Sequence, residues 1–116
     1  MLDRAERLQR QFSHQGMDAW EPPVDVVESG KELRVHVALP GVPADSITVG
    51  LEPDGISLSA LRAFPCRDEG ARIHRIEIPY GRFERWIGLG TNDFLLVSKA
   101  LANGVLTLVF RRKEGA

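Results

Sequence analysis

The chain has 116 residues, the length of one domain, and its 43% hydrophobic and 27% charged residues exclude a disordered chain. No apolar run approaches the roughly 20 residues that span a bilayer, and the first residues lack the apolar stretch of a secretory signal. The net charge of −1 gives no general attraction to phosphate backbones. We therefore expect a cytoplasmic protein that binds neither membrane nor nucleic acid. The single cysteine, Cys66, cannot form an intramolecular disulfide, which agrees with a reducing compartment.

The first predicted element lies in residues 2–12, where apolar side chains recur at three- and four-residue spacing. Leu2, Ala5, Leu8 and Phe12 would form a thin stripe on a short amphipathic helix. Such a helix is marginal in water without a partner surface. Two interpretations stay open: a frayed tail, or a segment that docks on a sister chain or another protein.

The predicted strands begin after Pro22 and Pro23, because two prolines prevent a helix from continuing. Apolar and polar residues then alternate in short runs over residues 24–28, 32–39, 46–52 and 56–61. Residues 62–81 interrupt this pattern with a long connection that holds one strand-like piece, residues 72–78. Strands resume at 83–89, 94–100 and 105–111, the last after Asn103-Gly104, a strong hairpin signal. The pattern predicts an all-β antiparallel sandwich.

Three stretches make the chain recognisable: "PPVDVVESGKELRVHVALPGVPADSITVGLE", "RIHRIEIPYGRFERWIGL" and "VSKALANGVLTL". Over residues 20–111 the chain resembles the small heat shock proteins, the alpha-crystallin domain chaperones. Asn103, Gly104, Val105 and Leu106 fit the closing motif of that family, although Lys99 replaces its usual alanine. The central motif is matched from His74 to Glu77 and again at Tyr80, Gly81, Phe83 and Arg85, with Ile78 and Pro79 as departures.

The resemblance implies an immunoglobulin-like β-sandwich at 20–111, preceded by a short segment at 1–19 and followed by a tail at 112–116. It also implies a homodimer in which a strand from the loop at 62–82 pairs with the edge of the partner's sheet. An edge strand without a neighbour in its own chain agrees with this. The implied interface residues are Arg72, Ile73, His74, Arg75, Ile76, Glu77, Ile78, Tyr80 and Arg85. Glu77 and Arg85 would form a charge pair, or would be ordinary surface charges.

The function that the resemblance implies is that of an ATP-independent holdase, which binds partly unfolded client proteins and prevents their aggregation. Clients or a neighbour's tail would bind a groove between the strands at 46–52 and 94–100. One face of the first strand would present Ile47, Val49 and Leu51, and one face of the second Leu96, Ser98 and Ala100. The alternative is that Ile47, Val49 and Leu51 belong to the core. Leu2, Leu8 and Phe12 would be further client contacts.

We expect no enzyme activity, cofactor or metal site. Gly30-Lys31 lacks the Ser or Thr and the earlier glycine of a phosphate loop, and His14, His36 and His74 lie far apart. Cys66 is either a bystander or a redox-sensitive contact. A different function remains open, that of a dedicated interaction module such as a co-chaperone or scaffold.

Assembly is the last expectation from the sequence. Members of the family usually carry an Ile-x-Ile or Ile-x-Val tail after the last strand, which builds large cages. Only residues 112–116 follow Arg111 here. We therefore expect a dimer, with weak further association through residues 2–12.

Overall fold

The computed structural model describes residues 19–66 and 68–115. Within these residues the chain forms seven strands and two short 3-10 helices. The strands are β1 (Val24–Ser29), β2 (Glu32–Ala38), β3 (Thr48–Glu52), β4 (Gly55–Arg62), β5 (Gly81–Gly88), β6 (Phe94–Ala102) and β7 (Val105–Arg112), and the 3-10 helices are η1 (Ala44–Ser46) and η2 (Thr91–Asp93). The N-terminal residues Leu2, Leu8 and Phe12 lie outside the described residues.

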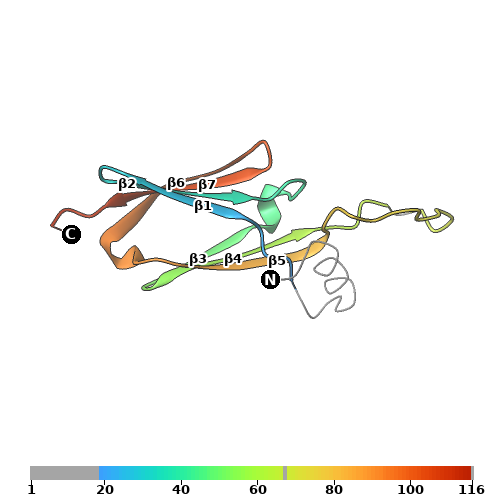
Figure 1. Cartoon of the computed structure of the whole chain (residues 1–116), viewed down its shortest axis with the longest axis horizontal. Coiled ribbons are helices and arrows are strands. Elements are labelled where there is room, and N and C mark those ends of the chain that lie inside the picture. The colour runs from blue at the N-terminus through green and yellow to red at the C-terminus, as the bar shows by residue number, and fades with distance from the viewer. Residues whose placement is uncertain (1–18, 67, 116) are drawn as a thin grey trace.

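The strands form two sheets that face each other (Figure 1). One sheet has the order β1-β2-β7-β6 and the other the order β3-β4-β5, and every pairing between these strands is antiparallel. The predicted all-β antiparallel sandwich is confirmed. Seven of the predicted strands are present, with ends that differ from the predicted ones by one or two residues.

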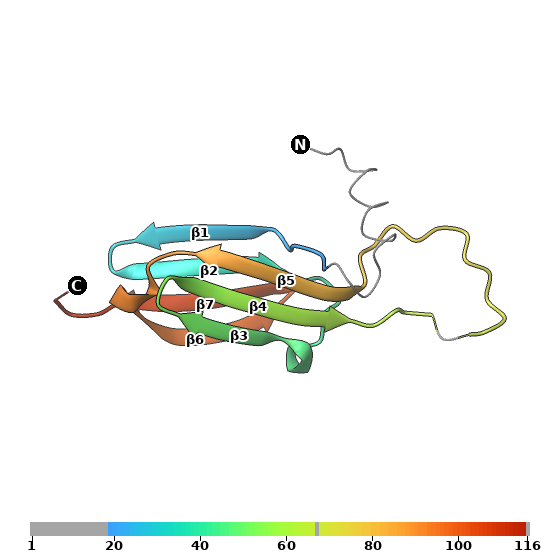
Figure 2. The same ribbon diagram turned by 90° about the horizontal axis from the view of Figure 1, so that it is seen from below.

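The eighth predicted strand, at residues 72–78, is wrong for the single chain. The connection from β4 to β5 contains no strand in its described residues and extends beyond the end of the sandwich (Figure 2). A strand needs a hydrogen-bonded neighbour, and the β-like pattern of these residues meets none within the chain.

The core lies between the sheets and follows the period of two that strands impose. In β7, Leu106, Leu108 and Phe110 are buried while the residues between them are half-buried. Apolar side chains of β2 and β4 complete the centre: Leu33, Val35, Val37, Ile56 and Leu58.

The turn between β6 and β7 has the backbone that the sequence predicted. Asn103 and Gly104 both have positive φ, 52° and 76°, as a type I′ turn requires. Ala102 and Val105 pair directly on either side of the turn. The amide of Leu39 also donates to the Gly104 carbonyl at 2.7 Å, which ties this hairpin to the end of β2.

A short segment before β1 links the two sheets. The Trp20 amide donates to the Arg82 carbonyl at 2.9 Å, and the Glu84 amide donates to the Trp20 carbonyl at 2.9 Å. These bonds place Trp20 beside Phe83 on the edge of β5, whereas β1 begins four residues later in the other sheet. The described chain therefore begins at the β5 edge of the sandwich.

Candidate protein-binding surfaces

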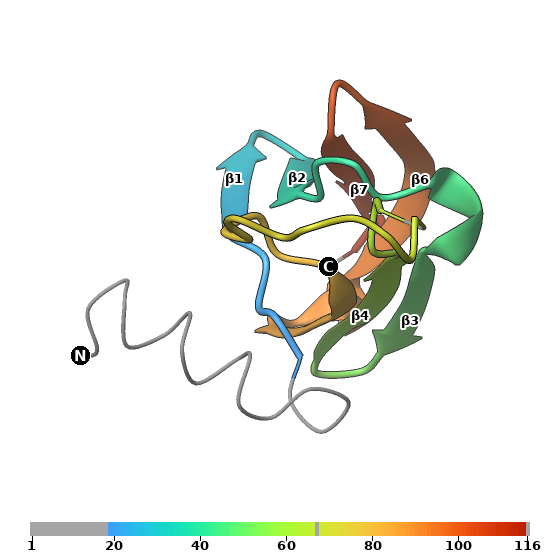
Figure 3. The same cartoon turned by 90° about the vertical axis from the view of Figure 1, so that its right-hand side faces the viewer.

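The groove was predicted between β3 and β6, which are the edge strands on one side of the sandwich (Figure 3). Along β3 the predicted residues differ in depth: Ile47, just before the strand, is 9% exposed and in the core, Val49 is half-buried against the core, and Leu51 is 52% exposed. The interpretation of Ile47 as a core residue is therefore correct, and Leu51 is the member of this set that is open to solvent.

A β-bulge changes the β6 side of this groove. Leu96 pairs with Phe110, whereas the next pair along is Ser98 with Val109, so Val97 is the extra residue. The extra residue moves Ser98 and Ala100 to the outer face of the sheet. The prediction that Leu96, Ser98 and Ala100 share a face is therefore wrong.

Lys99 and Leu101 take the inward places on β6, because they pair with the buried Leu108 and Leu106. Sequence reasoning missed both residues. The signal that was available is the apolar run Leu95-Leu96-Val97, which breaks strict alternation at the position of the bulge. Lys99 is exposed, so a charged side chain stands on the side of β6 that faces the groove.

The predicted dimer residues lie mostly in the connection between β4 and β5. Ile73 and Ile78 are 59% and 63% exposed. The base of the connection is fixed by the Phe64 and Tyr80 rings, whose centroids are 5.0 Å apart, and by Arg62 Nη1, which donates to the Pro79 carbonyl at 3.0 Å. The remaining residues of the predicted set between these points are Arg72, His74, Arg75, Ile76 and Glu77, and all but the half-buried Ile76 are exposed.

Glu77 and Arg85 have different partners within the chain. Glu77 Oε2 lies 3.4 Å from Arg75 Nη1, and Arg85 Nη1 donates to the Pro22 carbonyl at 3.3 Å from its place on β5. The single chain thus provides no pairing of Glu77 with Arg85.

The resemblance implies that the exchanged strand pairs with an edge of the partner's sheet, and β1 is one of the edge strands. In the described residues β1 pairs with β2 alone, and Val26 and Val27 are about half exposed. An extended segment could add to this edge by backbone hydrogen bonds.

The histidine and cysteine side chains considered for metal binding or redox chemistry lie in different parts of the fold. His36 Nδ1 is 3.2 Å from Thr107 Oγ1 on the outer face of the larger sheet, His74 is in the exposed connection, and Cys66 is exposed. Across residues 19–66 and 68–115, His, Cys, Asp and Glu form no group of three that could hold a metal ion. In the same residues no helix has the length and apolar character needed to cross a membrane.

Comparison with known proteins gives a consistent result. Residues 25–116 match the model of the "Hsp20/alpha crystallin family". The chain is 33% identical over 115 residues to "18 kDa antigen 1" of Mycobacterium intracellulare, covering 93% of this chain and 76% of that protein. It is 26% identical over 103 residues to "Small heat shock protein C4" of Rickettsia felis, covering 88% of this chain and 63% of that protein.

Among solved structures, hspA from Xanthomonas axonopodis superposes with a TM-score of 0.72 at 28% identity, covering 85% of this chain and 100% of that one. The family model covers β2 to β7 in full and β1 from Asp25 onward, so the sequence match and the fold match concern the same sandwich. The chain therefore belongs to the Hsp20/alpha crystallin family, the small heat shock proteins, which are not enzymes.

Proposed function

We propose that this protein is an ATP-independent holdase that binds partly unfolded proteins and prevents their aggregation in the cytoplasm. Family membership supports this role, and the observation that carries it is exposed apolar surface at the edge strands β3 and β6. Leu51 is 52% exposed and Val97 is 55% exposed. Apolar side chains held in contact with water at sheet edges suit the capture of extended apolar segments.

The client surface that we propose comprises the groove residues and the edge beside them. Four residues that belong to the core or pack against it would form its floor: Ile47, Val49, Leu96 and Leu101. The exposed Leu51 and Val97 would line its rim. Leu2, Leu8 and Phe12 remain proposed as further contacts. Because Lys99 stands at this rim, we expect clients with acidic residues beside an apolar segment to bind better than basic ones.

The aggregation of several unrelated heated proteins, followed by light scattering without nucleotide, tests this proposal. We expect suppression at a few-fold molar excess of the chaperone, and weaker suppression by Leu51→Ser/Val97→Ser. Leu61→Ser is the matched control, because Leu61 is 50% exposed but lies on the outer face of β4. Protection of none of the clients would contradict the holdase function and favour a dedicated interaction module with one specific partner.

We also propose a homodimer formed by strand exchange, in which residues 72–78 add to the β1 edge of the partner. Its support is the strand-like sequence of residues 72–78, which form no strand in the described chain, together with the edge position of β1. A reciprocal exchange is closed by twofold symmetry. In such a dimer Glu77 would leave Arg75 and pair with Arg85 of the second copy of the chain. This is the charge pair that the resemblance to the family implies.

A further inference from the structure

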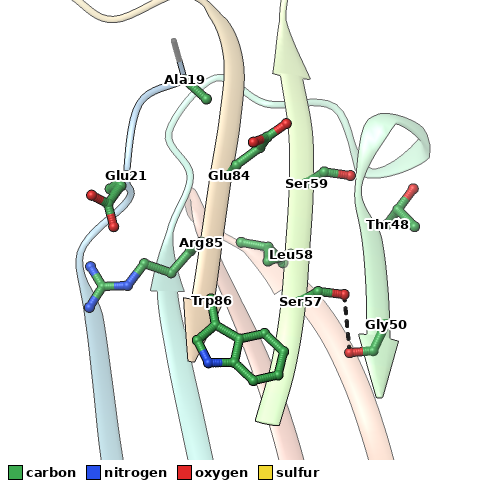
Figure 4. Close-up of a pocket in the computed structure, with 10 residues that line it drawn as sticks. All are labelled: Ala19, Glu21, Thr48, Gly50, Ser57, Leu58, Ser59, Glu84, Arg85 and Trp86. Atoms are coloured by element: carbon green, nitrogen blue, oxygen red, sulfur yellow. Dashed lines mark hydrogen bonds between the residues drawn. The ribbon is translucent and has the colours of Figure 1, made fainter. Parts of the chain in front are cut away.

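The outer face of the β3-β4-β5 sheet carries a hollow apart from the proposed groove, and among its lining residues Arg85 also belongs to the proposed dimer interface. Strand register places its side chains in rows: Thr48, Ser59 and Glu84 form one row, and Gly50, Ser57 and Trp86 form the next. Small side chains over β3 and β4 leave an open hollow of about 640 Å³, with Trp86 on one side (Figure 4).

Trp86 lies against the sheet over Gly55. A Cβ added to Gly55 would come within 2.5 Å of the indole ring, so the ring occupies the place of a side chain there. The opposite side of the ring faces water, and Trp86 is 49% exposed. An indole packed on one side and open on the other, beside a floor of small residues, is suited to receive another apolar side chain.

The chain's own N-terminal segment enters at the rim of this hollow. Ala19 and Glu21 are among the lining residues, and the backbone bonds of Trp20 fix this stretch to β5. Seven positions separate Phe12 from Ala19, a reach of up to about 24 Å. Neighbouring strands lie about 4.8 Å apart, so every part of the hollow is within that reach. The tether also gives the segment a local concentration in the millimolar range.

The composition of this segment fits the hollow. Leu8 and Phe12 are apolar and would cover the open side of Trp86. Arg4, Arg7 and Arg10 recur at three-residue spacing, and the rim carries the carboxylate of Glu21. Of the other charged lining residues, Glu84 is paired with Arg82, and Arg85 is itself positive. An arginine can also stack on an indole face.

We propose that residues 2–12 dock on the outer face of the β3-β4-β5 sheet of their own chain, with Phe12 and Leu8 against Trp86. The docked segment buries Trp86, which in the described residues is the exposed large aromatic side chain of this face. If Leu8 and Phe12 also bind clients, docking keeps them covered until a client competes for them. Only this link to client binding rests on the proposed function; the docking itself does not.

Fluorescence of the full chain tests the docking directly. In a Trp20→Phe background Trp86 is the sole tryptophan. We expect Leu8→Ser/Phe12→Ser to raise the iodide quenching constant of Trp86 about twofold and to shift its emission to longer wavelength. The matched control carries Trp20→Phe/Trp86→Phe/Leu95→Trp, which places the reporter on the other sheet, where the same two serines should change nothing. Equal quenching of Trp86 with and without the serines would overturn the proposal.

A disulfide trap identifies which chain's segment is bound. In a Cys66→Ser background, Phe12→Cys/Ser57→Cys should form a disulfide within one chain under mild oxidation, because Ser57 pairs with Trp86 and docking brings Phe12 to this row. Phe12→Cys/Thr107→Cys, which places the second thiol on the outer face of the other sheet, should not. A disulfide between chains, or none, would overturn docking on the same chain. Neither experiment contains a client, so both are independent of the holdase assay.

Discussion

Gly55 lies where the indole ring of Trp86 leaves no space for a side chain. The position of Gly55 after Pro53-Asp54 indicates a turn, which the structure contains. Its packing role is separate: the missing side chain makes room for the indole, and the Ile87 carbonyl oxygen lies only 2.6 Å from where a Cβ would be. The backbone oxygen cannot move without disturbing the pairing of β4 with β5.

We expect Gly55→Ala to lower the free energy of unfolding by about 1–3 kcal/mol, because the added methyl group must displace the ring or the strand. Urea unfolding, followed by circular dichroism, measures this change. Gly88→Ala is the matched control, since a Cβ there lies 3.6 Å from Trp86 Nε1, an ordinary contact. Equal losses in the two variants would show that glycine replacement in these strands, rather than the Trp86 contact, sets the cost.

Among the structural elements, those specified by a few neighbouring residues were predicted correctly, whereas features that depend on a partner strand were not. The β6–β7 hairpin was predicted because the preference of Asn103 and Gly104 for positive φ acts within two residues. The strand at 72–78 was not found, because its alternation specifies an edge but not a neighbour. The bulge at Val97 was also missed, since a local apolar run does not say which residue loses its cross-strand partner.

We expect a proline in residues 72–78 to dissociate the proposed dimer. Arg75→Pro and Ile76→Pro occupy adjacent positions, so one of them must remove a donor from any ladder with the partner's β1. The mass in solution should fall from about twice 12.9 kDa toward a single chain. Glu69→Pro is the control, because Glu69 occupies the second position of the turn closed by the Ala71 amide and the Asp68 carbonyl, where proline is favoured. Unchanged mass in both test variants would contradict strand exchange through this segment.

The whole molecule is held together by one core between the two sheets. Phe110 is 1% exposed and lies on β7, a central strand of the larger sheet. Its side chain belongs to the same buried cluster as Ile56 and Leu58 of the smaller sheet. Loss of the Phe110 ring would therefore weaken the packing between the two sheets.

We expect Phe110→Ala to lower the free energy of unfolding by about 3–5 kcal/mol, because it removes buried apolar surface and leaves a cavity. Chemical unfolding at equilibrium measures this loss. The comparison is Leu61→Ala, half exposed on the outer face of β4, for which a change within about 0.5 kcal/mol is expected. A similar loss in both variants would mean that the core does not dominate the stability.

The sequence by itself determined the strand pattern, the Asn103-Gly104 turn, the sandwich class and the family, because alternation, turn preferences and motif order are properties of neighbouring residues. Only the tertiary structure decided that Ile47 is core while Leu51 is exposed, that Ser98 and Ala100 face outward, and that Trp86 borders a hollow beside Ala19. These facts depend on register and on contacts between distant strands. A shift of one residue in register reverses the face of every side chain that follows, and no local pattern fixes that shift.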